Sequence, residues 1–132
     1  MQITRETDHA INCIQFLTKN WGDVSSVTEI ASTTKISKSF IAKILQKLAK
    51  ASLIESVQGK NGGFVMRKAP DEISLYDVVV TIQGPIALNK CVVNHWFCEN
   101  RDYCSVHPVF VEINQFITKK LQDVNFAELQ ET

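Results

Sequence analysis

The stretch Lys35–Lys68, KISKSFIAKILQKLAKASLIESVQGKNGGFVMRK, carries the pattern that decides the fold. After a turn that ends at Ser37, apolar residues recur at intervals of three and four, which predicts an amphipathic helix over residues 38–50. From Lys35 to Lys50, both included, there are five lysines and no acidic residue, so the opposite face of this helix is basic. Its apolar stripe consists of Ile41, Ile44, Leu45 and Leu48.

Two short strands, over residues 53–57 and 64–68, are predicted to follow this helix. The turn between them, QGKNGG over residues 58–63, is rich in residues that tolerate positive φ. A β-hairpin directly after a helix-turn-helix is a wing, in which glycines let the backbone approach a phosphate and Lys60 supplies charge. Nucleotide binding, the other use of a glycine-rich loop with lysine, is disfavoured because no helix begins after these glycines.

Helices are also predicted upstream of the basic helix. An apolar stripe indicates a helix over residues 4–20, and Asp8 lies on the far side of that stripe. Cys13, at the flank of the stripe, is interpreted as a packing residue. Ser25-Ser26 can cap a short helix over residues 27–34, and Ser37 is expected to cap the basic helix, which completes a helix-turn-helix.

Two more helices are predicted in the second half of the chain. Ser74 begins one over residues 75–83, and Gly84-Pro85 ends it. His107-Pro108 opens a long last helix whose apolar stripe is too wide for one contact, so one edge is expected to pack on its own domain and the other on a second copy. The predicted fold class is mainly α with a small β-hairpin, a winged helix-turn-helix plus a long C-terminal dimerisation helix.

The formal net charge of +0 conceals a polarised distribution. Residues 1–70 hold ten Lys/Arg and five Asp/Glu, a net of +5, whereas residues 71–132 hold four and nine, a net of −5. A basic N-terminal half is suited to binding a polyanion such as DNA. The alternative is that the lysines of this half form an ordinary solvated face. The candidate contacts with double-stranded DNA are Ser37, Lys38, Ser39, Lys43, Gln46, Lys47, Gln58, Lys60, Asn61 and Gly62.

Three of the four cysteines lie in one polar stretch, CVVNHWFCENRDYCSVH, with the spacing C-x6-C-x5-C-x2-H. These residues are Cys91, Cys98, Cys104 and His107. The N-terminus lacks a signal-peptide pattern and no apolar run is long enough to span a membrane, so a cytoplasmic location is expected. Thiols stay reduced there, which favours a metal or cofactor site over a disulfide.

The expected domain organisation follows from these elements. Residues 1–85 form a winged helix-turn-helix DNA-binding domain, residues 86–105 a cysteine-rich cluster-binding loop, and residues 106–132 a dimerisation helix and tail. The 132 residues, 45% of them hydrophobic, are enough for a real core.

This order of parts, with a GKNGG wing, a three-cysteine loop and a long last helix, resembles the Rrf-type family of bacterial regulators over nearly the whole chain. The resemblance implies a homodimeric transcription regulator whose DNA affinity is controlled by an iron–sulfur cluster that senses nitric oxide, redox or iron–sulfur status. Cys91, Cys98 and Cys104 match the three thiolate ligands of the family. His107 matches the fourth ligand of IscR-like members, which hold a 2Fe-2S cluster. Asp8 matches the NsrR-like ligand that crosses from the partner subunit to a 4Fe-4S cluster, so the cluster type stays open.

Two positions depart from the family pattern. Ala42 stands where IscR-like members carry a glutamate that discriminates between DNA sites, and Gln58 stands where many members carry an arginine. Three thiolates and a histidine also suit zinc, so a winged-helix regulator with structural zinc or no metal is the alternative. A small iron–sulfur electron carrier is a remote one, because a carrier has no use for a lysine helix and a glycine wing. No catalytic arrangement stands out, and an enzyme is not expected.

Overall fold

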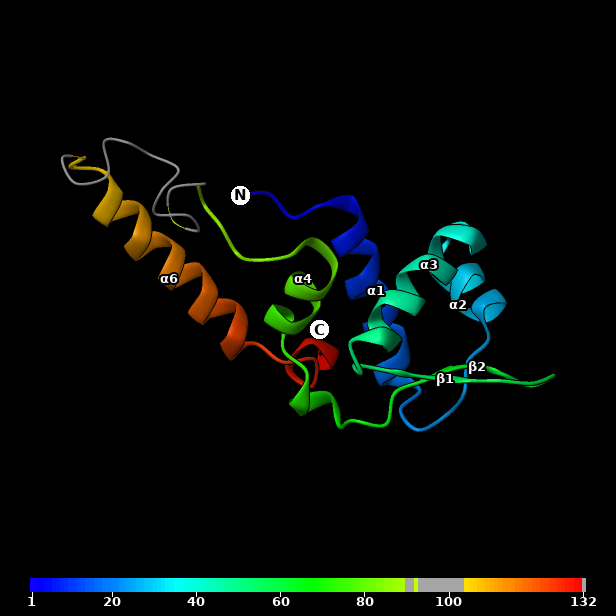
Figure 1. The fold of residues 1–132 in the computed structure, drawn as a ribbon. Helices are drawn as coiled ribbons and strands as arrows, with labels where there is room; N and C mark the ends of the chain where they lie inside the picture. Colours follow the sequence, from blue (N-terminus) through cyan, green and yellow to red (C-terminus); the bar gives the residue numbers. More distant parts are fainter. Residues whose placement is uncertain (90–91, 93–103, 132) are drawn as a thin grey trace.

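The structure is a computed structural model that describes residues 1–89, 92 and 104–131. In Figure 1, α1, α2, α3 and the hairpin form one body, and α6 lies on the other side of α4 as a separate long arm. The predicted fold class, mainly α with a small antiparallel hairpin, is confirmed. In chain order, the elements are α1 (Arg5–Lys19), α2 (Val27–Thr34), α3 (Lys38–Lys50), β1 (Glu55–Val57), β2 (Gly63–Val65), η1 (Pro70–Glu72), α4 (Leu75–Gln83), α6 (His107–Asp123) and η2 (Glu128–Glu131).

Side-chain caps fix where most of the helices begin. The Thr4 hydroxyl accepts a hydrogen bond from the backbone N–H of Thr7 at 3.2 Å, which satisfies a donor that the first turn of α1 would leave unpaired. Ser26 caps α2 in the same way. Ser74 and Asp77 form a reciprocal capping box at the start of α4. Ser37 is the N-cap residue of α3, as predicted, although its side chain makes no capping hydrogen bond.

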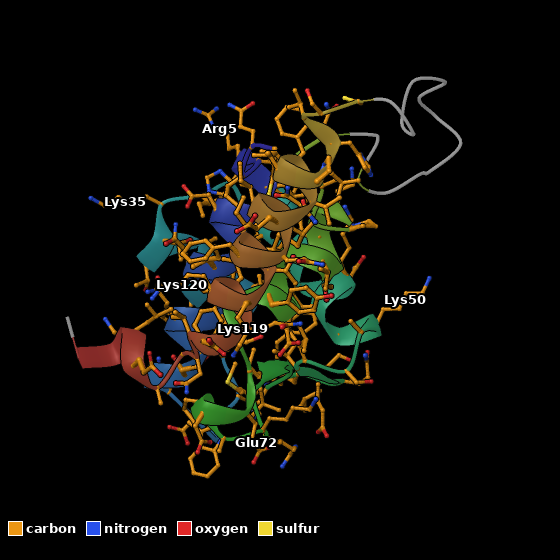
Figure 2. All side chains as sticks on the ribbon, turned by 90° about the vertical axis from the view of Figure 1, so that its left-hand side faces the viewer. Arg5, Lys35, Lys50, Glu72, Lys119 and Lys120 are labelled. Atoms are coloured by element: carbon orange, nitrogen blue, oxygen red, sulfur yellow. The ribbon has the colours of Figure 1, made fainter. Side chains whose placement is uncertain are left out.

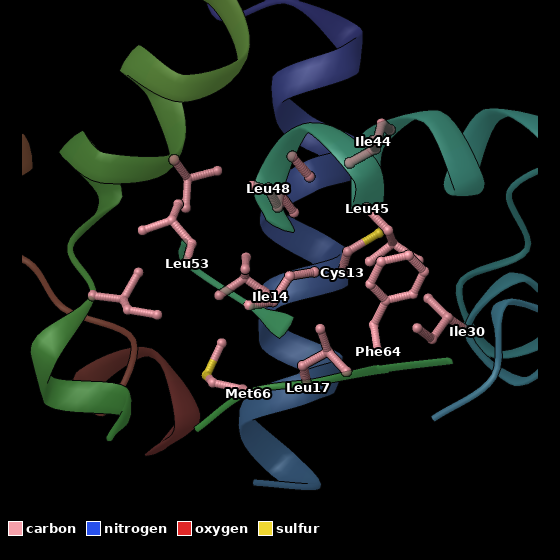
Figure 3. Packing of buried hydrophobic residues seen from close by; sticks show 14 of the residues in the cluster. Cys13, Ile14, Leu17, Ile30, Ile44, Leu45, Leu48, Leu53, Phe64 and Met66 are labelled. Carbon is pink, nitrogen blue, oxygen red and sulfur yellow. The ribbon is translucent and has the colours of Figure 1, made fainter. Parts of the chain in front are cut away.

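The core lies where α1, α3 and the hairpin meet. Figure 3 shows their buried side chains pointing toward one another, with Cys13 of α1 among them. The apolar stripe predicted for α3 is buried over its whole length. Burial of each large side chain contributes about 1.5–3 kcal/mol, so this cluster is the main stabilising element of the body. The cluster includes Ala10, Cys13, Ile14, Leu17, Ile41, Ile44, Leu45, Leu48, Phe64 and Met66.

The two strands of the wing pair in antiparallel register, with Ser56 opposite Phe64. They are shorter than the predicted strands over 53–57 and 64–68, because the backbone pairs elsewhere at the two ends: the N–H of Leu53 donates to the carbonyl of Leu48, and the carbonyl of Met66 accepts from Gly22. Ser25, just before α2, extends the sheet by one bridge, in which it exchanges two backbone hydrogen bonds of 2.9 Å with Phe64. The base of the wing is therefore fastened to the helix-turn-helix.

The tail after α6 returns to the core. The backbone N–H of Leu75 donates to the carbonyl of Val124 at 2.9 Å, and that of Phe126 donates to Ile73 at 3.1 Å. These bonds place the Phe126 side chain in the same core as α1 and α3, with 0% of its surface exposed. The sequence alone indicated only a short tail, so this anchor was missed. Within the described part of the chain, the helices are too short or too polar to cross a bilayer.

Candidate nucleic-acid interface and metal centre

The helix-turn-helix presents its polar face to solvent. Lys35 is the C-cap residue that follows α2, and its left-handed backbone, with a φ of 60°, reverses the chain into α3. Burial of the apolar stripe of α3 turns its other face outward, so the lysines remain hydrated and available to phosphates. The predicted contact residues in and before α3 are all exposed: Ser37, Lys38, Ser39, Lys43, Gln46 and Lys47.

The wing tip is built by glycines where the backbone needs them. Gly59 has a φ of 107°, and its carbonyl accepts from the N–H of Gly62 at 3.1 Å. A Cβ on Gly62 would lie 2.2 Å from the carbonyl oxygen of Val57, so only glycine fits this turn. The predicted wing contacts Gln58, Lys60 and Asn61 are exposed, and Gly62 is half-buried.

The hairpin and the start of α3 lie on the same side of the body. Figure 1 shows the hairpin reaching beyond the helices on the side where α2 and the first turns of α3 lie. An exposed basic helix beside a glycine-rich hairpin can place polar side chains against base edges while lysines neutralise phosphates. The structure thus brings together the two sets of residues that the sequence placed on a DNA-binding face.

Two contacts tie α3 back to α1. Lys47 forms an ion pair with Glu6, so this predicted DNA contact is shared with the first turn of α1. The ring of His9 meets the ring of Phe40 edge to face, with centroids 5.4 Å apart at an interplanar angle of 88°. The His9 Nδ1 atom is shielded from solvent and has no hydrogen-bond partner among the residues that the structure describes. The contact of His9 could not be predicted from local sequence, because its partner Phe40 lies 31 positions away.

The residues predicted to bind a metal are placed in two regions. Asp8 is exposed in the first turn of α1, on the side away from the core, as predicted. Cys104 is half-buried and is not in a disulfide, and His107 is the first residue of α6. Cys91 and Cys98 lie outside the described residues. In the described ranges, no group of three His, Cys, Asp or Glu side chains could hold a metal ion.

The chemistry of this donor set nevertheless fits an iron–sulfur cluster. Cys104 comes three residues before His107, and Pro108 follows in the first turn of α6, as the sequence predicts. A helix N-terminus carries a partial positive charge, which favours an anionic group beside it. Thiolates with a carboxylate or imidazole are suitable ligands for iron.

Cys13 differs from the cysteines of the polar stretch. It is fully buried between α1 and the rest of the core. Burial raises the pKa of the Cys13 thiol to about 12, so the thiol stays protonated near neutral pH and cannot act as a thiolate ligand. The interpretation of Cys13 as a packing residue is confirmed.

The outer face of α6 is apolar and exposed. No side chain of this helix is fully buried, and Phe116 is 72% exposed. Figure 2 looks at this side of the molecule and shows α6 in front of the other helices. The inner edge is held by Asn114, whose side chain bonds the backbone of Ile86 and Leu88. The exposed stripe consists of Val106, Val109, Ile113 and Phe116, three of which line a shallow cavity of about 310 Å³ with Glu112.

Comparison with known families gives a match over almost the whole chain. Residues 3–132 match the family model Rrf2, described as an iron-dependent transcriptional regulator. A protein of Rhizobium meliloti, aau3, is 35% identical over 91 residues, which are 69% of this chain and 59% of that protein. The matched region is thus less than two thirds of this relative's length.

Two further similarities concern a transcriptional regulator and a solved fold. The HTH-type transcriptional regulator NsrR of Halalkalibacterium halodurans is 33% identical over 110 residues, covering 83% of this chain and 72% of that protein. The structure of CymR (YrzC), the global cysteine regulator of B. subtilis, superposes with a TM-score of 0.82 at 21% identity, covering 99% of this chain and 97% of that one.

Proposed function

We propose that this chain, which belongs to the Rrf2 family of transcriptional regulators, is a homodimer whose affinity for double-stranded DNA is controlled by an iron–sulfur cluster. The observation that carries the proposal is the division of the molecule into two sides. The basic face of α3 and the glycine wing project from one side, and Cys104 lies at the start of the exposed apolar helix α6 on the other.

The DNA-binding part of the proposal rests on α3 and the wing. A helix of this size fits the major groove, where Ser39, Lys43 and Gln46 would face base edges or the adjoining phosphates. Lys60 and Asn61 at the wing tip would contact the backbone of a neighbouring groove. In a dimer the two copies of α3 would read half-sites about 34 Å apart, or one turn of DNA.

The dimer is supported by the exposed stripe of α6. An apolar face with Phe116 mostly in solvent is unfavourable for an isolated protein and typical of a surface that a partner covers. A second copy of α6 offers the same stripe, so a two-fold axis beside this helix would bury both faces at once. Glu112 at the edge of the stripe would stay at the polar rim.

Cys91, Cys98 and Cys104 would hold the cluster, with Asp8 of the partner subunit or His107 as the fourth ligand. Exposure of Asp8 on the side of α1 away from the core is what a ligand that crosses between subunits requires. His107 follows Cys104 by three residues and would act within one chain. When bound, the cluster would supply a group that gains or loses electrons or reacts with small molecules.

Control of DNA affinity requires that DNA distinguish two states of the protein. The cysteine stretch leads directly into α6, so a change in how its thiolates are held alters the start of the helix on which the dimer depends. A shift of α6 would change the distance and angle between the two copies of α3.

The test is metal analysis of protein purified without oxygen, with visible absorption. About two irons and two sulfides per chain would indicate a 2Fe-2S cluster, and His107→Ala should then release it. About four irons would indicate a 4Fe-4S cluster, and Asp8→Ala should then release it. Cys98→Ala should abolish iron binding in either case. A native protein that takes up no iron, even after reconstitution, would refute the cluster.

Zinc is the second candidate for the same ligands. Three thiolates and one imidazole form a common tetrahedral zinc set, and Cys104 and His107 are close enough in sequence for both to reach one ion. Zinc would make the site structural, so its removal should destabilise the protein without a redox response. A colourless protein with one zinc per chain would favour this reading.

A further inference from the structure

Gln83, the last residue of α4, joins two parts of the chain that are far apart in sequence. Its Oε1 atom accepts a hydrogen bond of 3.1 Å from the backbone N–H of Thr4 and one of 2.7 Å from the hydroxyl of Thr7. Its Nε2 atom donates to the carbonyl of Gln2 at 3.0 Å. Figure 1 shows the end of α4 beside the start of α1, so one side chain holds the whole N-terminal turn of that helix.

The hydroxyl of Thr7 connects Gln83 to the N-terminal cap of α1. Thr7 is fully buried, and its single hydroxyl proton is used for Gln83. The hydroxyl of Thr4, 2.9 Å away, therefore donates to Thr7 while it accepts the N–H of Thr7 as the helix cap. The cap of α1 and the hydrogen bonds of Gln83 form one network. The buried hydroxyl of Thr7 would lose its acceptor if an apolar residue replaced Gln83.

A second amide holds the segment that follows Gln83. The Oδ1 atom of Asn114 in α6 accepts from the N–H of Leu88 at 2.7 Å, and its Nδ2 atom donates to the carbonyl of Ile86 at 3.1 Å. Residues 84–89 are the stem that leads into the cysteine stretch. The stem is thus fixed at one end to α1 through Gln83 and along its length to α6 through Asn114.

We propose that Gln83 is a positioning residue that fixes the first turn of α1, which carries Asp8, relative to the stem of the cysteine stretch. The inference rests on the proposed function, and it names a residue through which that site is regulated. Gln83 touches none of the proposed ligands. It acts by holding two backbone segments of its own chain, as outer hydrogen bonds orient the ligands of a metal site. One is the stem that leads to the cysteines of that chain, and the other is the first turn of α1, whose Asp8 would serve the cluster of the partner subunit.

The same turn of α1 also touches the DNA-binding helix. Glu6 pairs with Lys47, and His9 packs against Phe40, so both ends of α3 meet residues that flank Asp8. A displacement of the cysteine stem would therefore pass through Gln83 to α1 and from α1 to α3 by contacts within one chain. Contacts alone do not demonstrate energetic coupling between two sites. The test therefore measures iron retention at the cysteine stretch and DNA affinity at α3.

The experiment compares Gln83→Leu with Gln83→Glu in the full-length protein. Leucine keeps the volume and removes all three hydrogen bonds, whereas glutamate keeps both acceptor bonds and loses only the bond to Gln2. Three quantities are measured. They are the rate of iron loss to a chelator, the ratio of DNA affinities with and without the cluster, and amide hydrogen exchange at Thr4 and Leu88 in the metal-free protein.

Gln83→Leu should lose iron about tenfold faster than the native protein, and its ratio of DNA affinities should move toward one. The metal-free variant should bind DNA as the native protein does, with faster exchange at Thr4 and Leu88. Gln83→Glu should stay close to native in every measurement. Thr7→Val, which removes the buried hydroxyl at nearly constant volume, should weaken iron retention in the same direction, and its combination with Gln83→Leu should add little.

Gln122→Leu is the matched control, because Gln122 is exposed on α6 and the change of side chain is the same. Thermal unfolding shows whether each variant is folded. If Gln83→Leu does not fold, Thr7→Val and Gln83→Glu carry the comparison. Native iron retention and a native affinity ratio in a folded Gln83→Leu protein would overturn the inference. A native protein without iron would instead overturn the proposed function, so the two failures are distinguishable.

Discussion

The body of the molecule and α6 are stabilised in opposite ways. α1 and α3 bury their apolar stripes in a core that includes the hairpin and Phe126. α6 is longer than either helix-turn-helix element, yet none of its side chains is fully buried, and Phe116 is 72% exposed. This contrast indicates that the body can fold on its own contacts, whereas α6 needs a further surface to bury its stripe. Two phenylalanines ten residues apart therefore have different physical roles.

The largest effect should come from Phe126→Ala. The side chain is fully buried against the main core, so its removal leaves a cavity and should lower the free energy of unfolding by about 3–5 kcal/mol. Urea unfolding at fixed protein concentration measures this loss. Phe116→Ala serves as the matched change in α6. A Phe126→Ala protein as stable as the native one would show that the tail does not anchor the core.

A smaller effect, on assembly rather than on folding, is expected from Phe116→Glu. A charge in the middle of the exposed stripe should weaken the dimer by about 2 kcal/mol or more while the helical content stays native. Sedimentation of native and variant proteins measures the dissociation constant. Gln115→Glu adds the same charge at an exposed position next to Phe116 and should leave the dimer intact. Equal dimer stability in the two variants would argue against this face as the interface.

The smallest effect on the free energy of unfolding at neutral pH should come from Cys13→Ala. Burial raises the pKa of the Cys13 thiol from 9.0 to about 12, so an unfolded chain releases this proton at a lower pH than the folded one. The stabilisation that this shift provides is complete below pH 9 and is lost as the pH rises from 9 to about 12. The free energy of unfolding, measured between pH 9 and about 12, should fall less steeply with pH in Cys13→Ala than in the native protein. An identical pH dependence in both proteins would contradict the buried, protonated thiol.

The comparison also separates what could and could not be predicted from the sequence. The bounds of α3 follow from its 3.6-residue stripe and those of α4 from Ser74 and Gly84, because these signals are local. Phe126 was missed because one aromatic residue in a short tail has no period, and only the folded chain brings Val124 beside Leu75. The predicted strands were too long because Leu53 and Met66 have strand-like side chains, whereas their backbones bond to Leu48 and Gly22 instead of to the partner strand.

The candidate site also contains features that local sequence predicts and features that depend on distant residues. Exposure of the α3 lysines and of Asp8 follows from helical geometry, so sequence reasoning places these side chains correctly. The Gln83 linkage could not be predicted, since Thr4 and Thr7 lie 79 and 76 positions away and a glutamine at a helix end is otherwise ordinary. The ligand roles of Cys91, Cys98, Cys104, His107 and Asp8 remain predictions.

The most direct test of the account is the affinity for operator DNA of one preparation before and after its cluster is removed, at a single salt concentration. DNA fragments selected from a random pool supply the probe. We predict that the native protein changes its affinity at least about tenfold between the two states, and that Cys98→Ala shows one affinity under both treatments. Equal affinities of the native protein with and without a bound cluster would contradict cluster control of DNA binding.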